Sequence, residues 1–137
     1  MLATPVMLAT AAVTILAIVL YFVMSANVGR MRAKHGVSAP ATSGHPEFDR
    51  AFRVQMNTLE HLPVFLPLLW LAALYFNWLP WAVPLLGVMW VAGRAIYMDA
   101  YMKDPAKRGP GFGICALAEV LLLVLALVGI VAAYLVI

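Results

Sequence analysis

Four side chains capable of acid–base or ligand-binding chemistry recur along one stretch of the chain with the spacing of a helix. Arg53, Asn57, Glu60 and His61 stand at i, i+4, i+7 and i+8, and residues with this spacing share one face of an α-helix. The stretch that follows, 62–79, carries no charge. Charged groups on a membrane helix face other protein or a wet cavity and avoid lipid. We therefore look for function on this polar stripe.

A second polar stretch has the same kind of spacing. Arg94, Tyr97 and Tyr101 stand at i, i+3 and i+7, and Arg108 follows in a loop. Together with the first stripe, these residues supply more guanidinium groups than carboxylates. Arginine binds carboxylates through paired hydrogen bonds, and Glu60 could hold an ammonium group. A small zwitterionic peptide with two carboxylates fits this set of groups.

A purely structural interpretation competes with ligand binding. An ion pair such as Glu60–Arg94 would only fasten two helices together, and Asp49 and Arg53 at i, i+4 would form an ordinary surface pair. Glu119 also has two interpretations. Glu119 stands alone in the last apolar segment and would either pair with a basic side chain at the inner end of the bundle or mark a proton path.

A metal or haem site is not expected. His61 could in principle ligate either group, but no second histidine stands at helical spacing from it. Cys115 is the only cysteine, which excludes an intrachain disulfide. Cys115 stands among apolar residues and is expected to be a small core residue.

Composition places these stripes in a membrane protein. The chain has 137 residues, of which 65% are hydrophobic and only 11% charged, whereas a soluble domain has about 25% charged residues. The uncharged runs are 1–29, 62–93, 109–118 and 120–137. About 20 apolar residues span a bilayer. We predict a single all-α domain over 1–137, a four-transmembrane-helix bundle with helices at about 5–30, 47–77, 80–101 and 112–137.

The basic residues predict how the bundle is oriented. All nine lysines and arginines lie in or beside the loops after the first and third helices. Such loops stay on the cytoplasmic side, so both chain ends are expected outside. The chain lacks a basic segment before its first apolar run, and we expect no cleaved signal peptide. The net charge of +3 follows from the loops, and no nucleic-acid partner is expected.

The two polar stretches carry a family resemblance. The motif Arg53-x-Gln55-x-Asn57-x-x-Glu60 and the block from Arg94 to Arg108 resemble the MAPEG family, the membrane-associated proteins of eicosanoid and glutathione metabolism. The resemblance covers nearly the whole chain and is closest to the branch of leukotriene C4 synthase and microsomal glutathione transferase. It implies a homotrimer of four-helix subunits, with glutathione in a cleft between subunits near the cytoplasmic face.

The resemblance also implies a role for each matching residue. Glutathione contacts from one subunit would come from Arg53, Asn57, Glu60, Tyr97, Tyr101 and Arg108, with Arg108 stabilising the thiolate, while Arg32 and Gln55 would come from the neighbouring subunit. Gln55 lies about 160° around the helix from Arg53, which agrees with a separate role. His61 and Arg94, which the spacing places in the same polar region, complete the expected glutathione-binding set.

Two positions depart from the leukotriene C4 synthase pattern. His61 stands where that branch has a tyrosine, and Ala33 stands where it has a second basic residue. Neither departure argues against glutathione binding, but both argue against assuming the leukotriene reaction. The expected function is therefore a membrane-bound glutathione transferase or peroxidase, which acts on hydrophobic small-molecule electrophiles or lipid hydroperoxides.

Two other classes of function stay open at this stage. A small transporter would use Glu60 or Glu119 to carry protons or cations, although arginines outnumber carboxylates in the site. A membrane scaffold would keep the fold and a thiol-binding site without turnover. The absence of an organelle signal favours a bacterial inner membrane.

Overall fold

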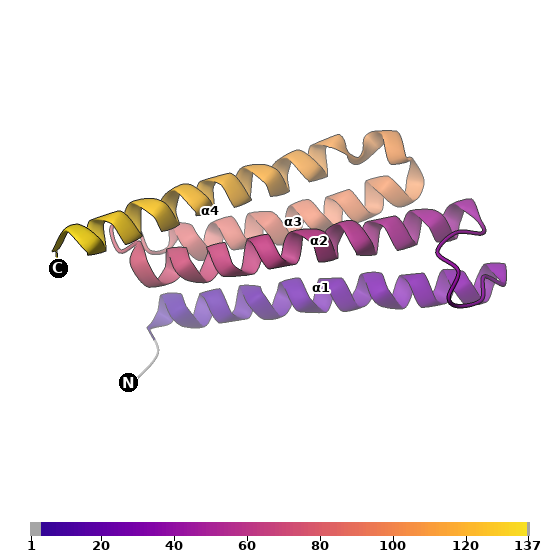
Figure 1. Cartoon of the computed structure of the whole chain (residues 1–137), viewed down its shortest axis with the longest axis horizontal. Coiled ribbons are helices and arrows are strands. Elements are labelled where there is room, and N and C mark those ends of the chain that lie inside the picture. Colours follow the sequence, from indigo (N-terminus) through magenta and orange to yellow (C-terminus); the bar gives the residue numbers. More distant parts are fainter. Residues whose placement is uncertain (1–3, 137) are drawn as a thin grey trace.

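The computed structural model describes residues 4–136, and every regular element within this range is helical. In chain order the elements are α1 (Pro5–His35), α2 (Pro46–Tyr75), α3 (Ala82–Lys103), a short 3₁₀ helix η1 (Pro105–Arg108) and α4 (Gly109–Val136). The long helices lie side by side as an elongated bundle (Figure 1). The α1–α2 loop and η1 lie at one end, and both chain ends lie at the other. The all-α prediction is confirmed, and the two basic loops share one end of the bundle.

The helix boundaries differ from the expected ones for local reasons. α1 continues through the basic cluster to His35, because long unbranched basic side chains are good helix formers. Gly36 then ends α1 in the left-handed conformation (φ 65°), and its N–H donates to the Arg32 carbonyl. α2 begins at Pro46, where the missing N–H of proline is tolerated. α4 begins at Gly109, directly after η1, rather than near residue 112.

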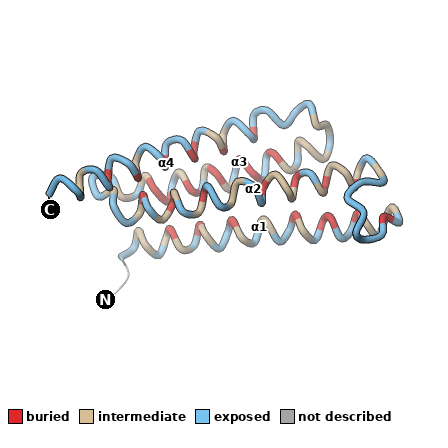
Figure 2. The backbone as a smooth tube through the Cα atoms, viewed as in Figure 1, coloured by how far each residue is buried: buried red, intermediate tan, exposed pale blue. Residues whose placement is uncertain are grey.

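The apolar content of the helices suits a membrane. α1, α2 and the segment Pro105–Val136 are each long and apolar enough to cross a bilayer. α3, which carries Arg94, is shorter, with 22 residues, and is not one of these three segments. Figure 2 shows buried residues on the faces that the helices turn toward one another and exposed residues on their outer faces. Many of the outward side chains are large and apolar, such as Leu85, Leu127 and Tyr134, as lipid contact requires.

The core holds α3 close to its neighbours. Phe65 of α2 stacks on Trp90 of α3, with ring centroids 4.0 Å apart. Gly111, in the first turn of α4, lies against the α3 backbone: a Cβ atom there would come within 2.5 Å of the Tyr97 amide nitrogen. Small residues allow such close helix contact in membrane proteins. The contact fixes the start of α4, which follows η1 directly, against α3.

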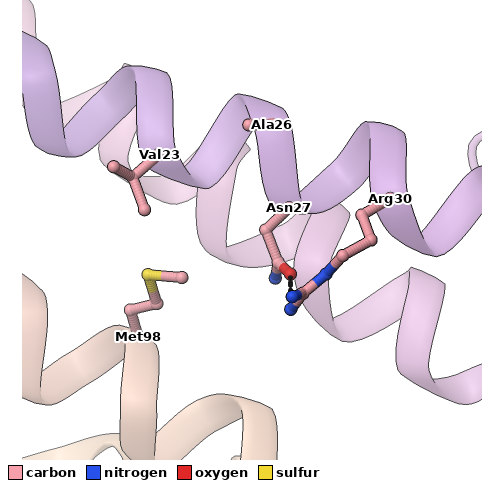
Figure 3. A pocket seen from close by; sticks show the side chains of 5 residues that line it. All are labelled: Val23, Ala26, Asn27, Arg30 and Met98. Carbon is pink, nitrogen blue, oxygen red and sulfur yellow. Dashed lines mark hydrogen bonds between the residues drawn. The ribbon is translucent and has the colours of Figure 1, made fainter.

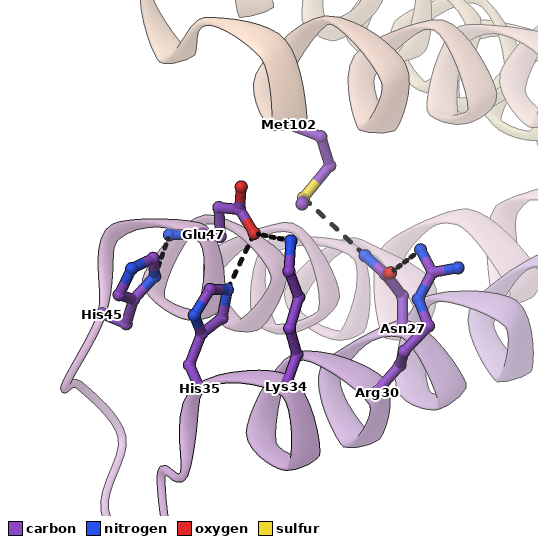
Figure 4. Close-up of polar contacts among 7 residues, drawn as sticks. All are labelled: Asn27, Arg30, Lys34, His35, His45, Glu47 and Met102. Carbon is purple, nitrogen blue, oxygen red and sulfur yellow. Dashed lines mark hydrogen bonds and ion pairs between the residues drawn. The ribbon is translucent and has the colours of Figure 1, made fainter.

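An ionic cluster joins the end of α1 to the start of α2 (Figure 4). Glu47 Oε2 accepts from Lys34 Nζ at 2.7 Å and lies 2.8 Å from His35 Nε2. His45 Nδ1 accepts from the Glu47 N–H, and its ring stacks on that of His35 with centroids 3.5 Å apart. His35 is the last residue of α1, and only 14% of its side chain is exposed, while His45 is the N-cap residue of α2.

The same contacts determine how Glu47 titrates. Glu47 lies in the first turn of α2, outside the apolar section that starts near Leu62. Hydrogen bonds from Lys34 and then His35 lower the pKa of Glu47 from its ordinary value of 4.5 to about 2. Because the folded pKa is the lower one, the contact stabilises the fold above about pH 4.5. That stabilisation is lost as the pH falls through about 2.

We expect Lys34→Met to raise the pKa of Glu47, because the variant removes its strongest hydrogen-bond donor. The measurement is the ¹³C shift of the Glu47 carboxyl carbon in detergent between pH 7 and pH 2. Lys103→Met is the matched control, since Lys103 pairs with Asp99 instead, at 2.7 Å. An unchanged Glu47 midpoint in Lys34→Met would show that Lys34 is not the source of the shift.

Candidate functional site

The polar stripe of α2 forms a connected hydrogen-bonded chain. Arg53 Nη1 donates to Glu60 Oε1 at 3.3 Å, two turns along the helix. Asn57 Nδ2, which lies between them, approaches Glu60 Oε2 at 3.5 Å. About half of each charged side chain remains exposed, 53% for Arg53 and 52% for Glu60. The stripe is therefore organised but open on its outer side.

Arg94 of α3 joins this series of hydrogen bonds from inside the bundle. Its side chain is completely buried, and Nη1 donates to Asn57 Oδ1 at 2.7 Å. The guanidinium lies 5.3 Å from the Trp90 ring and 5.2 Å from the Tyr97 ring. Within residues 4–136, Nε and Nη2 of Arg94 have no hydrogen-bond partner. Arg94 thus places a buried positive charge directly behind the stripe and fixes Asn57 with its Nδ2 group toward Glu60.

The two ion pairs considered from the sequence, Glu60–Arg94 and Asp49–Arg53, do not form. Glu60 pairs with Arg53 along α2, whereas Arg94 donates to Asn57. Asp49 does not pair with Arg53, because its carboxylate accepts from the hydroxyl of Ser43 and the N–H of Gly44, each at 3.0 Å. Asp49 therefore holds the loop before α2 in place, and Arg53 pairs with Glu60 instead.

The remaining residues of the second motif lie at the same end. Tyr97 and Tyr101 are neighbours on α3, with ring centroids 5.5 Å apart. Tyr97 is buried, and Tyr101 is half-buried. Arg108 is the last residue of η1 and is exposed. Asp104 caps η1 by accepting from the Ala106 N–H at 3.0 Å, so the turn that carries Arg108 is locally fixed.

Arg32 and Gln55 lie on the α1 side of the protomer. Gln55 Nε2 donates to Ser25 Oγ at 2.8 Å and approaches Tyr21 Oη at 3.5 Å, so it contacts α1 rather than the stripe. Arg32 Nη1 donates to the Ala41 carbonyl at 2.8 Å, and its guanidinium stacks over the Phe48 ring. The structure thus separates these two residues from the other predicted site residues of the same protomer.

His61 takes part in a different contact from the one expected. Its Nδ1 lies 2.9 Å from Oε1 and 3.1 Å from Oε2 of Glu119, on α4. Trp90 Nε1 also donates to Glu119 Oε1, at 2.8 Å. Glu119 therefore pairs with a basic side chain, and that partner is His61. We name His61, Glu119 and Trp90 the interior triad.

Sequence reasoning missed Trp90. Its position, four residues before Arg94 on the same helix, was the available signal, since residues at i, i+4 share a face. It also missed a groove of about 280 Å³ between α1 and α3, lined by Val23, Ala26, Asn27, Arg30 and Met98 (Figure 3). In this groove Arg30 Nη2 donates to Asn27 Oδ1 at 2.8 Å. None of the predicted site residues lines the groove.

No metal cluster is found in the part of the chain that the structure describes. Among residues 4–136, no group of three or more histidine, cysteine or carboxylate side chains is close enough to hold an ion. Cys115 is buried, and its Sγ approaches the Trp90 carbonyl at 3.5 Å. The polar side chains described at this end of the bundle supply guanidinium, amide, phenol, carboxylate and imidazole groups.

Comparison with known proteins identifies a family that this chain matches. The sequence profile of the MAPEG family matches residues 10–128. Microsomal glutathione S-transferase 2 of Mus musculus is 41% identical over 108 residues, covering 79% of this chain and 72% of the mouse protein. Leukotriene C4 synthase of Cavia porcellus is 38% identical over 125 residues, covering 91% of this chain and 82% of the guinea-pig protein.

An uncharacterised protein of Synechocystis is also similar. It is 47% identical over 120 residues, which cover 88% of this chain and 86% of the cyanobacterial protein. The profile match extends across the greater part of all four long helices and includes both polar motifs. The resemblance found in the sequence is thereby confirmed, including the branch it pointed to. The chain belongs to the MAPEG family.

Proposed function

We propose that this protein is a membrane-bound glutathione transferase, with peroxidase activity, that activates the glutathione thiolate for attack on lipophilic electrophiles or lipid hydroperoxides. The observation that carries the proposal is the connected chain Arg53–Glu60–Asn57–Arg94, which spans α2 and α3 and stays open on its outer side. Relatives named as glutathione transferase and leukotriene C4 synthase support the same class of reaction.

These hydrogen-bonded side chains of α2 and α3 suit a zwitterionic tripeptide as ligand. Arg53 can bind a carboxylate through two hydrogen bonds, and Glu60 can accept from an ammonium group. Arg94 holds the oxygen of Asn57, which directs the Nδ2 donor toward the half-exposed Glu60. The buried charge of Arg94 adds positive potential behind the ligand. Tyr97 and Tyr101 line the neighbouring face of α3 and complete the proposed glutathione site with Arg108.

Arg108 is the proposed thiolate-stabilising residue. A free thiol with a pKa near 8.5 is only a few per cent ionised at neutral pH. A guanidinium beside the sulfur favours the charged form, and each unit of pKa corresponds to about 1.4 kcal/mol. Arg108 is the last residue of η1 and is exposed, so a bound ligand can reach it.

We infer that the site is completed in a homotrimer. Arg53 and Glu60 are each about half exposed in the protomer, yet they lie on a helix that is long and apolar enough to cross a membrane. Such groups need cover from protein or water. A neighbouring subunit would supply it through Arg32 and Gln55, which use only some of their N–H groups within their own protomer.

The proposed arrangement in the membrane follows from the charge distribution. α3 crosses the bilayer together with the three more apolar helices, which gives four spans. The basic loops at one end of the bundle face the cytoplasm, with the glutathione site near that face and both chain ends outside. The membrane is a bacterial inner membrane, and the hydrophobic second substrate arrives through the lipid.

A glutathione titration tests the proposal. We expect purified protein in detergent at neutral pH to develop a saturable ultraviolet thiolate band as glutathione is added. Oxidised glutathione, which has no thiol, is the control ligand and should give no band. If there is no band and calorimetry detects no binding, the glutathione function is wrong, and a transporter or a silent scaffold becomes the better explanation.

A further inference from the structure

The interior triad places a single carboxylate in an otherwise apolar part of the bundle. Glu119 is the only charged residue of α4, and 11% of its side chain is exposed. It accepts hydrogen bonds from two other helices, from His61 on α2 and from Trp90 on α3. A buried carboxylate needs such donors, because removing its charge from water is costly. The role of His61 depends on which of its ring nitrogens this contact leaves free.

The contact determines which nitrogen of His61 is free. Nδ1 faces both oxygens of Glu119, at 2.9 and 3.1 Å, so its hydrogen is directed at the carboxylate. Nε2 is then the ring atom left to accept or donate a proton. A carboxylate on Nδ1 orients the ring and stabilises its protonated form. His61 keeps 21% of its side chain exposed, so a ligand can reach the ring.

The position of His61 relates this pair to the proposed thiolate. His61 is one turn beyond Asn57 on the α2 stripe, toward the apolar half of the helix. Its ring meets that of Phe112 edge-on, with centroids 5.6 Å apart. Phe112 follows Arg108 by four residues, about one helical turn. The imidazole therefore lies between the thiolate-activating arginine and the section from which an apolar substrate would come.

We propose that His61 is the catalytic acid for substrates whose leaving group needs a proton, that Glu119 is its positioning residue, and that these substrates are lipid hydroperoxides. The inference rests on the proposed glutathione function and adds the proton donor for its hydroperoxide substrates. An alkoxide is a poor leaving group in an apolar site, and general acids of this kind contribute about 10²–10⁴-fold to rate.

The reaction balances with glutathione as the only reductant. The thiol of glutathione gives its proton to Nε2 of His61, which leaves an imidazolium beside Glu119. The thiolate attacks the terminal oxygen of the hydroperoxide, an S–O bond forms and the O–O bond breaks, giving glutathione sulfenic acid and an alkoxide. The alkoxide takes the proton from Nε2 and leaves as the alcohol. A second glutathione reduces the sulfenic acid, which yields the disulfide and water.

A merely structural pair predicts a different result from an acid. A contact that only joins α2 to α4 would affect every reaction of the site by the same factor. An acid has an added effect on reactions that need a proton on the leaving group, beyond the removal of the thiol proton that both reactions share. Chloride leaves an activated aryl chloride without protonation, whereas the alkoxide of a lipid hydroperoxide does not leave easily. The ratio of the two rates therefore separates the roles, and any effect on glutathione binding cancels in the ratio.

The experiment measures both rates in one membrane preparation of the full chain, with a linoleic acid hydroperoxide and an activated aryl chloride as probes. We expect His61→Gln to lower the ratio of hydroperoxide reduction to conjugation by about 100-fold or more. Glu119→Gln should lower it less, because the imidazole can still carry a proton on Nε2 but no longer has a carboxylate beside Nδ1. Thr14→Val is the control, since it removes another interhelical contact, Trp70 Nε1 to Thr14 Oγ1 at 3.2 Å, and should leave the ratio unchanged.

The outcomes separate this inference from the proposed function. If the ratio is unchanged in His61→Gln, or if Thr14→Val lowers it equally, His61 is not the acid. A wild-type protein that shows the thiolate band but reduces no hydroperoxide also overturns the inference, while glutathione activation stands. A wild-type protein without the band overturns the proposed function itself.

Discussion

Arg108→Ala is expected to bind glutathione and fail to ionise it. The variant removes the guanidinium beside the sulfur, and the other proposed contacts, on α2 and α3, stay in place. Loss of one preorganised charge-stabilising group typically costs about 10²–10³-fold in rate. We expect conjugation to fall within that range at neutral pH. The dissociation constant for glutathione should change much less, because the carboxylates and the ammonium group keep their partners.

The measurement pairs the ultraviolet thiolate band with calorimetric binding on the same sample. Lys107→Ala is the matched control. Lys107 is the neighbouring cation on η1, it leaves 74% of its side chain exposed, and its Nζ is 4.0 Å from Asp104. Its removal should leave the band intact. Persistence of the band in Arg108→Ala would assign thiol activation to another group, and loss of binding would make Arg108 a general anchor for the ligand.

Gly111→Ala is expected to destabilise the protein strongly and to lower activity. The added Cβ would lie 2.5 Å from the Tyr97 nitrogen, 2.7 Å from its Cα and 2.9 Å from the Gly93 carbonyl oxygen. These are backbone atoms, which cannot move aside as a flexible side chain can. Overpacking a tight core contact typically costs about 1–3 kcal/mol. Because α4 must shift away from α3, Arg108, which directly precedes α4, should also be displaced.

Gly113→Ala is the matched control for this substitution. It lies two residues further along the same helix, and a Cβ atom there would meet nothing within 4 Å. Alanine is the better helix former by about 0.5–1 kcal/mol, so this variant should be neutral or slightly more stable. Thermal unfolding in detergent gives both values. Equal stability of the two variants would show that α3 and α4 are not in close backbone contact at Gly111.

Local periodicity predicted one part of the site and not the other. The Arg53, Asn57 and Glu60 stripe follows from helical spacing alone, because its members lie on one helix, and the structure joins them by hydrogen bonds. The Arg94–Asn57 contact was not predictable, since it depends on the register between α2 and α3. The interior triad depends on three helices, and spacing within one helix cannot indicate which histidine Glu119 meets.

The ends of the helices likewise include contacts that local sequence patterns cannot predict. α1 was expected to end near residue 30, but it continues to His35 and ends where Gly36 takes the left-handed conformation that favours glycine. The stacking of His35 on His45 could not be predicted, since their approach depends on how the loop returns to α2. Gln55 was expected to point away from the stripe, and it does, toward α1. Its contact with Ser25 could not be read from the angle alone.

The order of these contacts along the chain bears on how the protein is made. Arg94 is synthesised after its partner Asn57, and Glu119 is synthesised after both His61 and Trp90. A charge at the centre of a membrane helix costs about 2.5–3.5 kcal/mol during insertion. Each buried charge of the interior therefore emerges from the ribosome when a neutral polar partner is already available. Before α4 is synthesised, only the imidazole of His61 and the indole of Trp90 lack their partner Glu119. The bundle can therefore assemble in the direction of translation.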